Sequence, residues 1–275
     1  MSSLIGLAGG STGGDYYAYT VDKSCRFNDN DSAYMSRAWG AAGTEETWTV
    51  SFWAKLAAVA GSRAILSGVY TDDNTRSALN LSTGGSINLY EKASGVLKWN
   101  VSTTPIYRDP SAWGHWVVAY DTTQAADANM FKVWFNGVAQ AITAGGDYPA
   151  QHYVGVINAN GTHEIGRHDA NEYVDGYDGY LAEFAFIDGT ALTPSSFGET
   201  NDDGIWVPKD ISGLTFDDRS FYLDFKVAPG TGNGAGTDVS GEANHWTDSG
   251  LAANDQVADS PTNNYCTLNS VFHDL

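Results

Sequence analysis

The stretch "TWTVSFWAK", residues 47–55, alternates apolar and polar side chains over most of its length. In an extended chain, one face carries Trp48, Val50, Phe52 and Ala54, while the other face is mostly hydroxyl-bearing. A period of two is the pattern of a β-strand with one face toward a core. The stretch therefore predicts a half-buried strand, and the rest of the chain can be compared with it.

Similar short stretches recur along the 275 residues, at 77–82, 86–92, 115–121, 130–137, 163–168, 179–189 and 220–226. The first two of these predict one hairpin, and the next two predict another. Only "LTPSSFGE", residues 192–199, indicates helix, because Thr193 can act as the N-cap before Pro194. About ten short strands with one helical turn predict an all-β fold, a two-sheet antiparallel jelly-roll sandwich.

The composition excludes several classes of partner. Lys and Arg number 14 against 33 Asp and Glu, a formal net charge of -19, so we expect no nucleic-acid partner. No apolar run approaches the roughly 20 residues that span a bilayer, and the first residues, "MSSLIGLAGGSTGG", lack the features of a secretory signal. We therefore expect a soluble chain with no membrane insertion and no export signal.

Three regions differ in composition. Residues 1–19 are rich in glycine and are expected to form a flexible N-terminal arm. Residues 20–228 contain the predicted strands and form the sandwich. Residues 229–275 are rich in Gly, Asn and Asp and are expected to be a loop-rich C-terminal extension that packs on the sandwich.

The ordered motifs resemble one known family, the concanavalin A-like, laminin G-like jelly-roll domains, in the version found in structural proteins of tailed bacteriophages. The resemblance extends from about residue 20 to 270. It is carried by "SCRFNDNDSAYMSR", "TWTVSFWAKL", "YRDPSAWGHWVVAYDTTQ", "FKVWFNGV", "HEIGR", "DGYLAEFAFIDGTALTPSSFGE", "GIWVPK", "FYLDF" and "DSPTNNYCTLN".

The resemblance implies a non-enzymatic bacteriophage virion surface protein, a tail-fibre, receptor-binding or adhesion module that contacts host-surface glycans. The alternative is a capsid decoration or head-fibre protein that binds neighbouring virion subunits, and a glycan-degrading enzyme is less favoured. The expected partners are other virion proteins, bound through the arm, and host polysaccharide. We expect a homo-oligomer on the particle surface, assembled in the host cytoplasm. Cys25 and Cys266 could pair only if the chain ends meet, and intracellular assembly favours free thiols.

Catalysis is disfavoured by the surroundings of Glu183. The glucanase members of the superfamily that this chain resembles carry three acids on one strand face, whereas Leu181 and Ala185 stand two residues either side of Glu183. The six histidines occur without a nucleophile elbow that would carry a catalytic serine. We interpret Glu183 as a buried structural acid, with Arg167 as its first candidate partner.

Calcium is a candidate ligand, although no cofactor is required. The sequence "TDVSGEANHW", residues 237–246, resembles the "DxSGNGN" loop of laminin G-like domains, which makes Asp238 and Asn244 the candidate Ca²⁺ ligands. A solvated polar turn is the alternative interpretation. At Glu183 itself, Ala182 replaces the first acid of the family's acidic pair, which weakens a metal role there.

Glycan contacts are predicted in two loops that combine aromatic rings with amide and carboxylate groups, since rings stack on sugars and polar groups bind hydroxyls. The candidate glycan-binding residues are Tyr70, Asp72, Asp73 and Asn74 in one loop and Tyr173, Tyr177 and Asp178 in the other.

Overall fold

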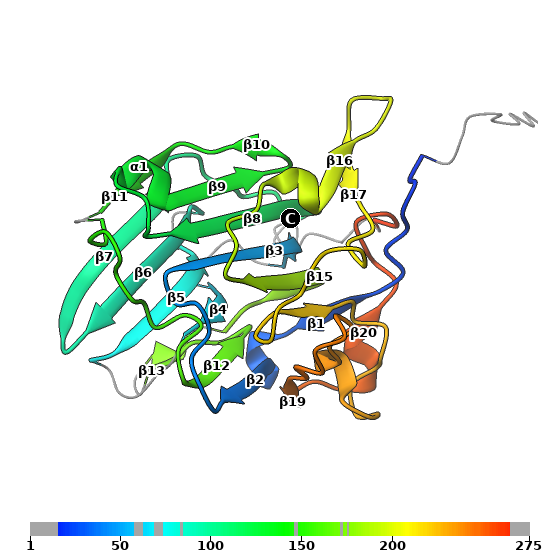
Figure 1. The fold of residues 1–275 in the computed structure, drawn as a ribbon. Helices are drawn as coiled ribbons and strands as arrows, with labels where there is room; N and C mark the ends of the chain where they lie inside the picture. Colours follow the sequence, from blue (N-terminus) through cyan, green and yellow to red (C-terminus); the bar gives the residue numbers. More distant parts are fainter. Residues whose placement is uncertain are drawn as a thin grey trace, which may run out of the picture.

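The computed structural model describes residues 16–57, 63–68, 74–82, 85–145, 148–170, 173–174 and 176–264. Over these residues the regular secondary structure is almost entirely β, with two large antiparallel sheets lying face to face (Figure 1). The predicted all-β jelly-roll sandwich is confirmed. No helix in the described ranges has the length and hydropathy needed to cross a membrane.

Sheet A has eight strands. Their order is β10 (Val138–Ala139), β9 (Phe131–Phe135), β8 (Gly114–Asp121), β3 (Thr47–Leu56), β15 (Gly179–Asp188), β1 (Ser24–Phe27) and β20 (Gln256–Val257), with β18 (Phe221–Leu223) pairing to β15.

Sheet B also has eight strands. Their order is β11 (Ile142–Ala144), β7 (Val96–Thr103), β6 (Ile87–Ala93), β5 (Arg76–Leu81), β4 (Arg63–Ser67), β12 (Gly161–Ile165), β2 (Tyr34–Trp39) and β19 (Thr247–Ser249). Two small pairs complete the strands, β13 (Asp169–Ala170) with β14 (Tyr173–Val174) and β16 (Gly198–Thr200) with β17 (Trp206–Pro208). Both predicted hairpins are confirmed, because β5 pairs with β6 and β8 pairs with β9.

In the part of the chain that the structure describes, helical structure is limited to short turns. The predicted turn is a 3₁₀ segment, Pro194–Ser196, with Thr193 as its N-cap residue, although Thr193 makes no capping hydrogen bond. The sequence missed α1 (Asp127–Met130), a single turn between β8 and β9. Further 3₁₀ turns span Asp29–Asp31, Gly234–Gly236 and Ala253–Asp255.

The main core lies between the sheets and is built around the aromatic side chains of β3 and its neighbours. Trp48 stacks on Tyr120 with ring centroids 5.0 Å apart, and on Phe186 at 5.8 Å. Trp99 of sheet B meets Tyr120 at 6.0 Å and so joins the two sheets. Burial of such rings is the main source of stability in a sandwich of this kind.

The outer face of sheet A is also covered. Trp53, which points outward from β3, is 4% exposed and packs with Val21 and Ala182 in a second apolar cluster. A third cluster joins Ala185 to residues such as Phe197 in the segments that follow β15. Strand β3 is therefore buried on both faces, rather than half-buried as predicted, because later segments of the chain add a third layer.

One part of this third layer is the segment Gln256–Asn264, which we call the C-terminal clasp. Lys55 is completely buried, and its Nζ lies 2.8 Å from Asp259 Oδ2 and 2.8 Å from Asn264 Oδ1. Trp113 Nε1 donates to Asp259 Oδ1 at 2.9 Å. Ser260 Oγ donates to the Val21 carbonyl at 2.5 Å. The clasp thus ties the C-terminal region to both β3 and the N-terminal segment.

Candidate functional site

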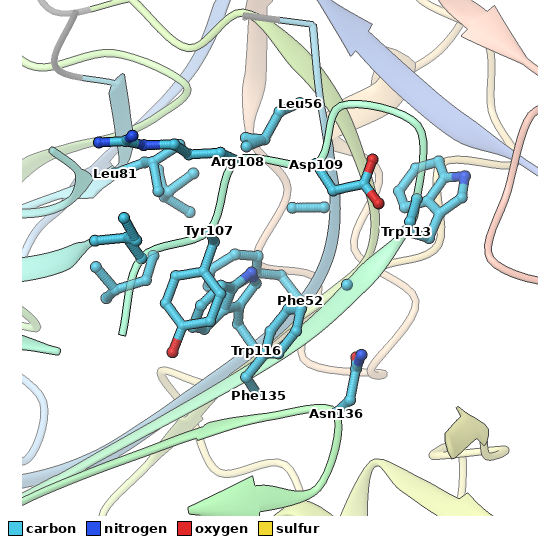
Figure 2. Close-up of a pocket in the computed structure, with 16 residues that line it drawn as sticks. Phe52, Leu56, Leu81, Tyr107, Arg108, Asp109, Trp113, Trp116, Phe135 and Asn136 are labelled. Carbon is cyan, nitrogen blue, oxygen red and sulfur yellow. The ribbon is translucent and has the colours of Figure 1, made fainter. Parts of the chain in front are cut away.

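A pocket of about 390 Å³ opens between the two sheets at one end of the sandwich (Figure 2). We call it the end pocket. Its volume lies within the range of small-molecule sites in proteins. The lining residues are Phe52, Ala54, Leu56, Ile65, Leu81, Ile87, Ile106, Tyr107, Arg108, Asp109, Ala112, Trp113, Gly114, Trp116, Phe135 and Asn136.

The end pocket is formed where strands of both sheets end or begin and the chain crosses from sheet B to sheet A. The segment 104–113 makes this crossing between β7 and β8. Tyr107 N donates to the Gly85 carbonyl at 2.7 Å, and Tyr107 Oη donates to Gln140 Oε1 at 2.8 Å. These bonds hold the crossing segment over the gap between the sheets.

Aromatic rings dominate one wall. The ring of Tyr107 lies edge-on to that of Trp116, with centroids 4.2 Å apart. The ring centroid of Phe135 is 4.5 Å from that of Trp116 and 4.8 Å from that of Tyr107. The close approach of Phe135 requires Gly114, because a Cβ there would lie 2.4 Å from the ring. Figure 2 shows these rings grouped on one side of the pocket.

Polar groups stand at the mouth. Arg108 and Asp109 are exposed, and Asn136 is half-buried in the turn after β9. Asp109 accepts hydrogen bonds from Ser111 N at 2.8 Å and Ser111 Oγ at 2.5 Å, which lowers the pKa of this carboxyl. Asp109 is therefore ionised at neutral pH. An aromatic wall beside a charged and amide-bearing rim suits recognition of a sugar.

The first predicted glycan loop can be placed only in part. Tyr70, Asp72 and Asp73 lie outside the described residues. Asn74 is exposed and lies just before β5, where its carbonyl accepts a hydrogen bond from Gly95 N at 3.0 Å. It does not line the end pocket.

The second loop differs from the prediction at Tyr177. Its side chain is 0% exposed, lies edge-on to Phe27 at 6.0 Å, and donates to the Lys55 carbonyl at 3.3 Å. A ring in this position has no face for a sugar, so the prediction for Tyr177 is wrong. Asp178 is half-buried, and burial raises the pKa of its carboxyl. For Tyr173, the structure describes only its place in β14.

Asp238 and Asn244 lie close together, but their side chains are engaged with the protein itself. Asp238 Oδ1 accepts from Tyr222 N and Ser240 N, both at 2.9 Å, and Oδ2 accepts from Ser240 Oγ at 2.9 Å and Asn244 N at 2.7 Å. Asn244 Oδ1 accepts from an Arg37 nitrogen at 2.7 Å. These bonds fold the loop and leave calcium binding here as a prediction. Among the described residues, no three His, Cys, Asp or Glu side chains are grouped to hold a metal.

Glu183 lies at an irregularity in β15, where the pairing register with β3 shifts between Ala182 and Ala185. Its backbone φ of 49° is in the left-handed region, which is uncommon for residues other than glycine. Glu183 Oε2 accepts hydrogen bonds from Tyr222 Oη and, at 3.2 Å, from Tyr19 Oη. The predicted burial is correct, since the residue is 5% exposed.

The predicted partner of Glu183 is wrong. Arg167 follows β12 in sheet B, pairs with Glu164 at 2.5 Å, and covers the ring of Tyr34. Glu183 instead points to the outer face of sheet A, where two tyrosines take the place of a cation. Burial raises the pKa of the Glu183 carboxyl to about 7.

This raised pKa predicts a pH-dependent stability that Glu183→Gln removes. The folded pKa of about 7 lies above the ordinary value of 4.5, so the folded state binds more protons between these values. The contribution of Glu183 to stability is fully present below pH 4.5 and is lost as the pH rises through 7, by about 3 kcal/mol. Buried histidines such as His115, whose pKa is lowered, act in the opposite direction over this range, so the test is a difference. In urea melts from pH 4.5 to 8, the free energy of unfolding of the unmodified protein minus that of Glu183→Gln should fall by this amount. The exposed Glu199→Gln is the control, and parallel curves for all three proteins would contradict the assignment.

A hydrolytic site of the Ser-His type is excluded at the one described place where such side chains meet. Ser51 Oγ lies 2.9 Å from His115 Nε2, but Trp206 Nε1 donates to His115 Nδ1 at 3.0 Å. Nδ1 is therefore the acceptor nitrogen, and Nε2–H donates to Ser51. A general base requires the reverse arrangement. Burial also lowers the pKa of His115 to about 3.

The end pocket was missed from the sequence. It is built from the ends of strands that are far apart in the chain, so no single stretch of sequence predicts it. The local signal was "IYRDPSAW", residues 106–113, in which aromatic and charged residues flank a proline between two strands.

Comparison with known proteins agrees with the fold. Residues 28–196 match the model of a family described as the concanavalin A-like lectin/glucanases superfamily. A comparison with curated protein sequences finds no match.

Similar solved structures come from several organisms. A Bacteroides ovatus protein to which carbohydrate binding has been ascribed has a TM-score of 0.53 at 14% identity, covering 84% of this chain and 58% of that chain. The heptameric SAP-like pentraxin of Limulus polyphemus has a TM-score of 0.45 at 17% identity, covering 63% and 78%. The CBM40 domain of the Ruminococcus gnavus IT-sialidase, bound to α2,3 sialyllactose, has a TM-score of 0.43 at 12% identity, covering 63% and 93%.

Proposed function

Because this chain belongs to the concanavalin A-like lectin/glucanases superfamily, we propose that it is a non-catalytic carbohydrate-binding protein whose sugar site is the end pocket. The observation that carries the proposal is the combination of an aromatic wall, Tyr107, Trp116 and Phe135, with the polar rim at Arg108 and Asp109.

Absence of catalysis is supported by the acids near the end pocket. Glycan cleavage on paired carboxylates needs two such groups about 5–10 Å apart across the scissile bond. Among the described lining residues, Asp109 is the one carboxylate, and its pKa is lowered rather than raised. A general acid needs the opposite shift. We expect no release of reducing ends from any polysaccharide that binds.

The finer proposal is that the protein stands on the surface of a bacteriophage virion and contacts host-surface polysaccharide there. This rests on the ordered motifs that resemble phage structural proteins. Residues 1–19 would attach it to other virion proteins as a homo-oligomer. The alternative is a capsid decoration or head-fibre protein that binds neighbouring virion subunits. Labelling on purified particles separates the two, since receptor binding requires a tail location and decoration a capsid location.

The double variant Arg108→Ala/Asp109→Ala is expected to weaken polysaccharide binding at least tenfold. Each charged group would hydrogen-bond sugar hydroxyls, and such bonds contribute about 1.5–3 kcal/mol each. Calorimetry on a panel of bacterial surface polysaccharides measures the loss.

The control is Lys98→Ala/Asp202→Ala, which removes one base and one acid from exposed positions outside the pocket. Equal binding by both double variants would place the sugar elsewhere on the protein. No binding by the unmodified chain to any polysaccharide would contradict the proposed function.

A further inference from the structure

The end pocket has a chemical gradient along its depth. Its most buried lining residues are apolar and come from both sheets: Phe52 is 0% exposed, Ile65 2%, and Leu81 and Ile87 3% each. The charged rim residues are exposed. Among the described lining residues, the charged side chains thus stand at the mouth, and the most buried ones, deeper between the sheets, are apolar.

This gradient is a poor match for an unsubstituted sugar. A hexose carries hydroxyl groups around its ring, and a hydroxyl buried without a partner weakens binding by roughly five- to a hundredfold. A methyl group buried in the same place strengthens binding by about fourfold. The inner pocket therefore selects a ligand with a small apolar substituent attached to a polar body.

An acetyl group has both properties. Its methyl would lie against Leu81 and Ile87, which keep a small exposed surface deep in the pocket, and its carbonyl would reach the polar rim together with the ring hydroxyls. The side chain of Ile106, 56% exposed at the mouth, offers further apolar contact to the sugar ring. Resting on the proposed function, we propose that the end pocket binds an acetylated sugar, with the acetyl methyl group inserted between the sheets.

The acetyl group could be carried on nitrogen or on oxygen. The test therefore uses three N-acetylhexosamines, a hexose 6-O-acetate and the parent hexoses, each added at millimolar concentration to the full chain. Saturation-transfer NMR should show the strongest transfer at the acetyl methyl protons. Titration should show at least tenfold tighter binding of an acetylated sugar than of its parent. The form that binds identifies the attachment.

Two variants test whether the sugar binds in the end pocket. Ala112 is exposed and lines the pocket, so Ala112→Phe should block the mouth and abolish transfer to the methyl group. Ala125 is exposed in the loop after β8, away from the pocket lining, so Ala125→Phe is the matched control and should bind normally. Thermal melts of both variants confirm that each is folded.

The remaining outcomes separate this inference from the proposed function. If parent and acetylated sugars bind equally, the acetyl assignment is wrong and the carbohydrate-binding function stands. If acetylated sugars bind as well to Ala112→Phe, the end pocket is the wrong site. If no sugar or polysaccharide binds, both the inference and the proposed function are overturned.

Discussion

Lys55→Met is expected to lower the free energy of unfolding by about 3–5 kcal/mol, because it leaves the Asp259 carboxylate buried without its cation. Lys55 is 0% exposed and Asp259 is 5% exposed. The ammonium group lies 2.8 Å from Asp259 Oδ2. Desolvation of a charge in such a place is offset largely by the opposite charge beside it, so removal of one partner costs far more than the net value of the pair. Urea denaturation measures the loss.

A double-mutant cycle tests this reason. Asp259→Asn alone should also be strongly destabilising, since it removes the negative charge beside the buried ammonium group, while Lys55→Met/Asp259→Asn should be less destabilised than the sum of the two. The control is Lys226→Met, because Lys226 pairs with Asp22 at 3.5 Å with both side chains largely exposed. That exposed pair contributes about 0–1 kcal/mol. Strictly additive losses at Lys55 and Asp259 would show that the ion pair does not couple them.

The Lys55 variants also bear on the sugar site. Asp259 accepts a hydrogen bond from Trp113, which lines the end pocket. Loosening of the C-terminal clasp should therefore disturb one wall of the end pocket, and sugar affinity should fall even where the chain remains folded.

Asp238→Ala is the second large effect, with an expected loss of about 3–5 kcal/mol in the free energy of unfolding. The substitution removes the acceptor of four hydrogen bonds, and each buried donor left without an acceptor costs about 1–3 kcal/mol, less some relaxation of the loop. Three of the four donors are backbone amides, those of Tyr222, Ser240 and Asn244, which cannot reorient as freely as a hydroxyl group. Thermal and urea melts measure the change.

The control for Asp238→Ala is Asp210→Ala. Asp210 is exposed and accepts from Ser212 N at 2.9 Å, so its removal should cost less than about 1 kcal/mol.

Running the same melts with calcium and with chelator also tests the predicted metal site. A calcium-dependent rise in midpoint that Asp238→Ala abolishes would support the metal role. If Asp238 only holds the loop by hydrogen bonds, Asp238→Ala should lose the same free energy of unfolding with calcium as with chelator.

The sequence predicted the parts of the fold that local periodicity determines. Thr47–Leu56 alternates, and its apolar set lies in the core as expected. The opposite face could not be assigned, since its cover comes from residues such as Val21 and the clasp, which no local pattern connects to β3. Trp53, an aromatic residue on the polar side, was the one local sign of that third layer.

The candidate site was less predictable for the same reason. Glu183 was correctly expected to be buried, because its neighbours in sequence are apolar. Its partner depends on which sheet and which face it occupies, and the tyrosines that bind it are at positions 19 and 222. Tyr177 lies in a loop with the composition of a binding site, but its ring points inward and packs against Phe27. Composition alone does not show which way a side chain points.

The position of β1 has a consequence for the order of folding. This strand lies between β15 and β20, so its two neighbours are synthesised long after it. The contact between Val21 and Ser260 joins residues 239 apart in the chain. Pairings at such separation close a long loop and form slowly. Of the strands described, β1 is thus the first to be synthesised and among the last to pair. Until it pairs, both of its edges carry unpaired backbone groups that could bind to other chains.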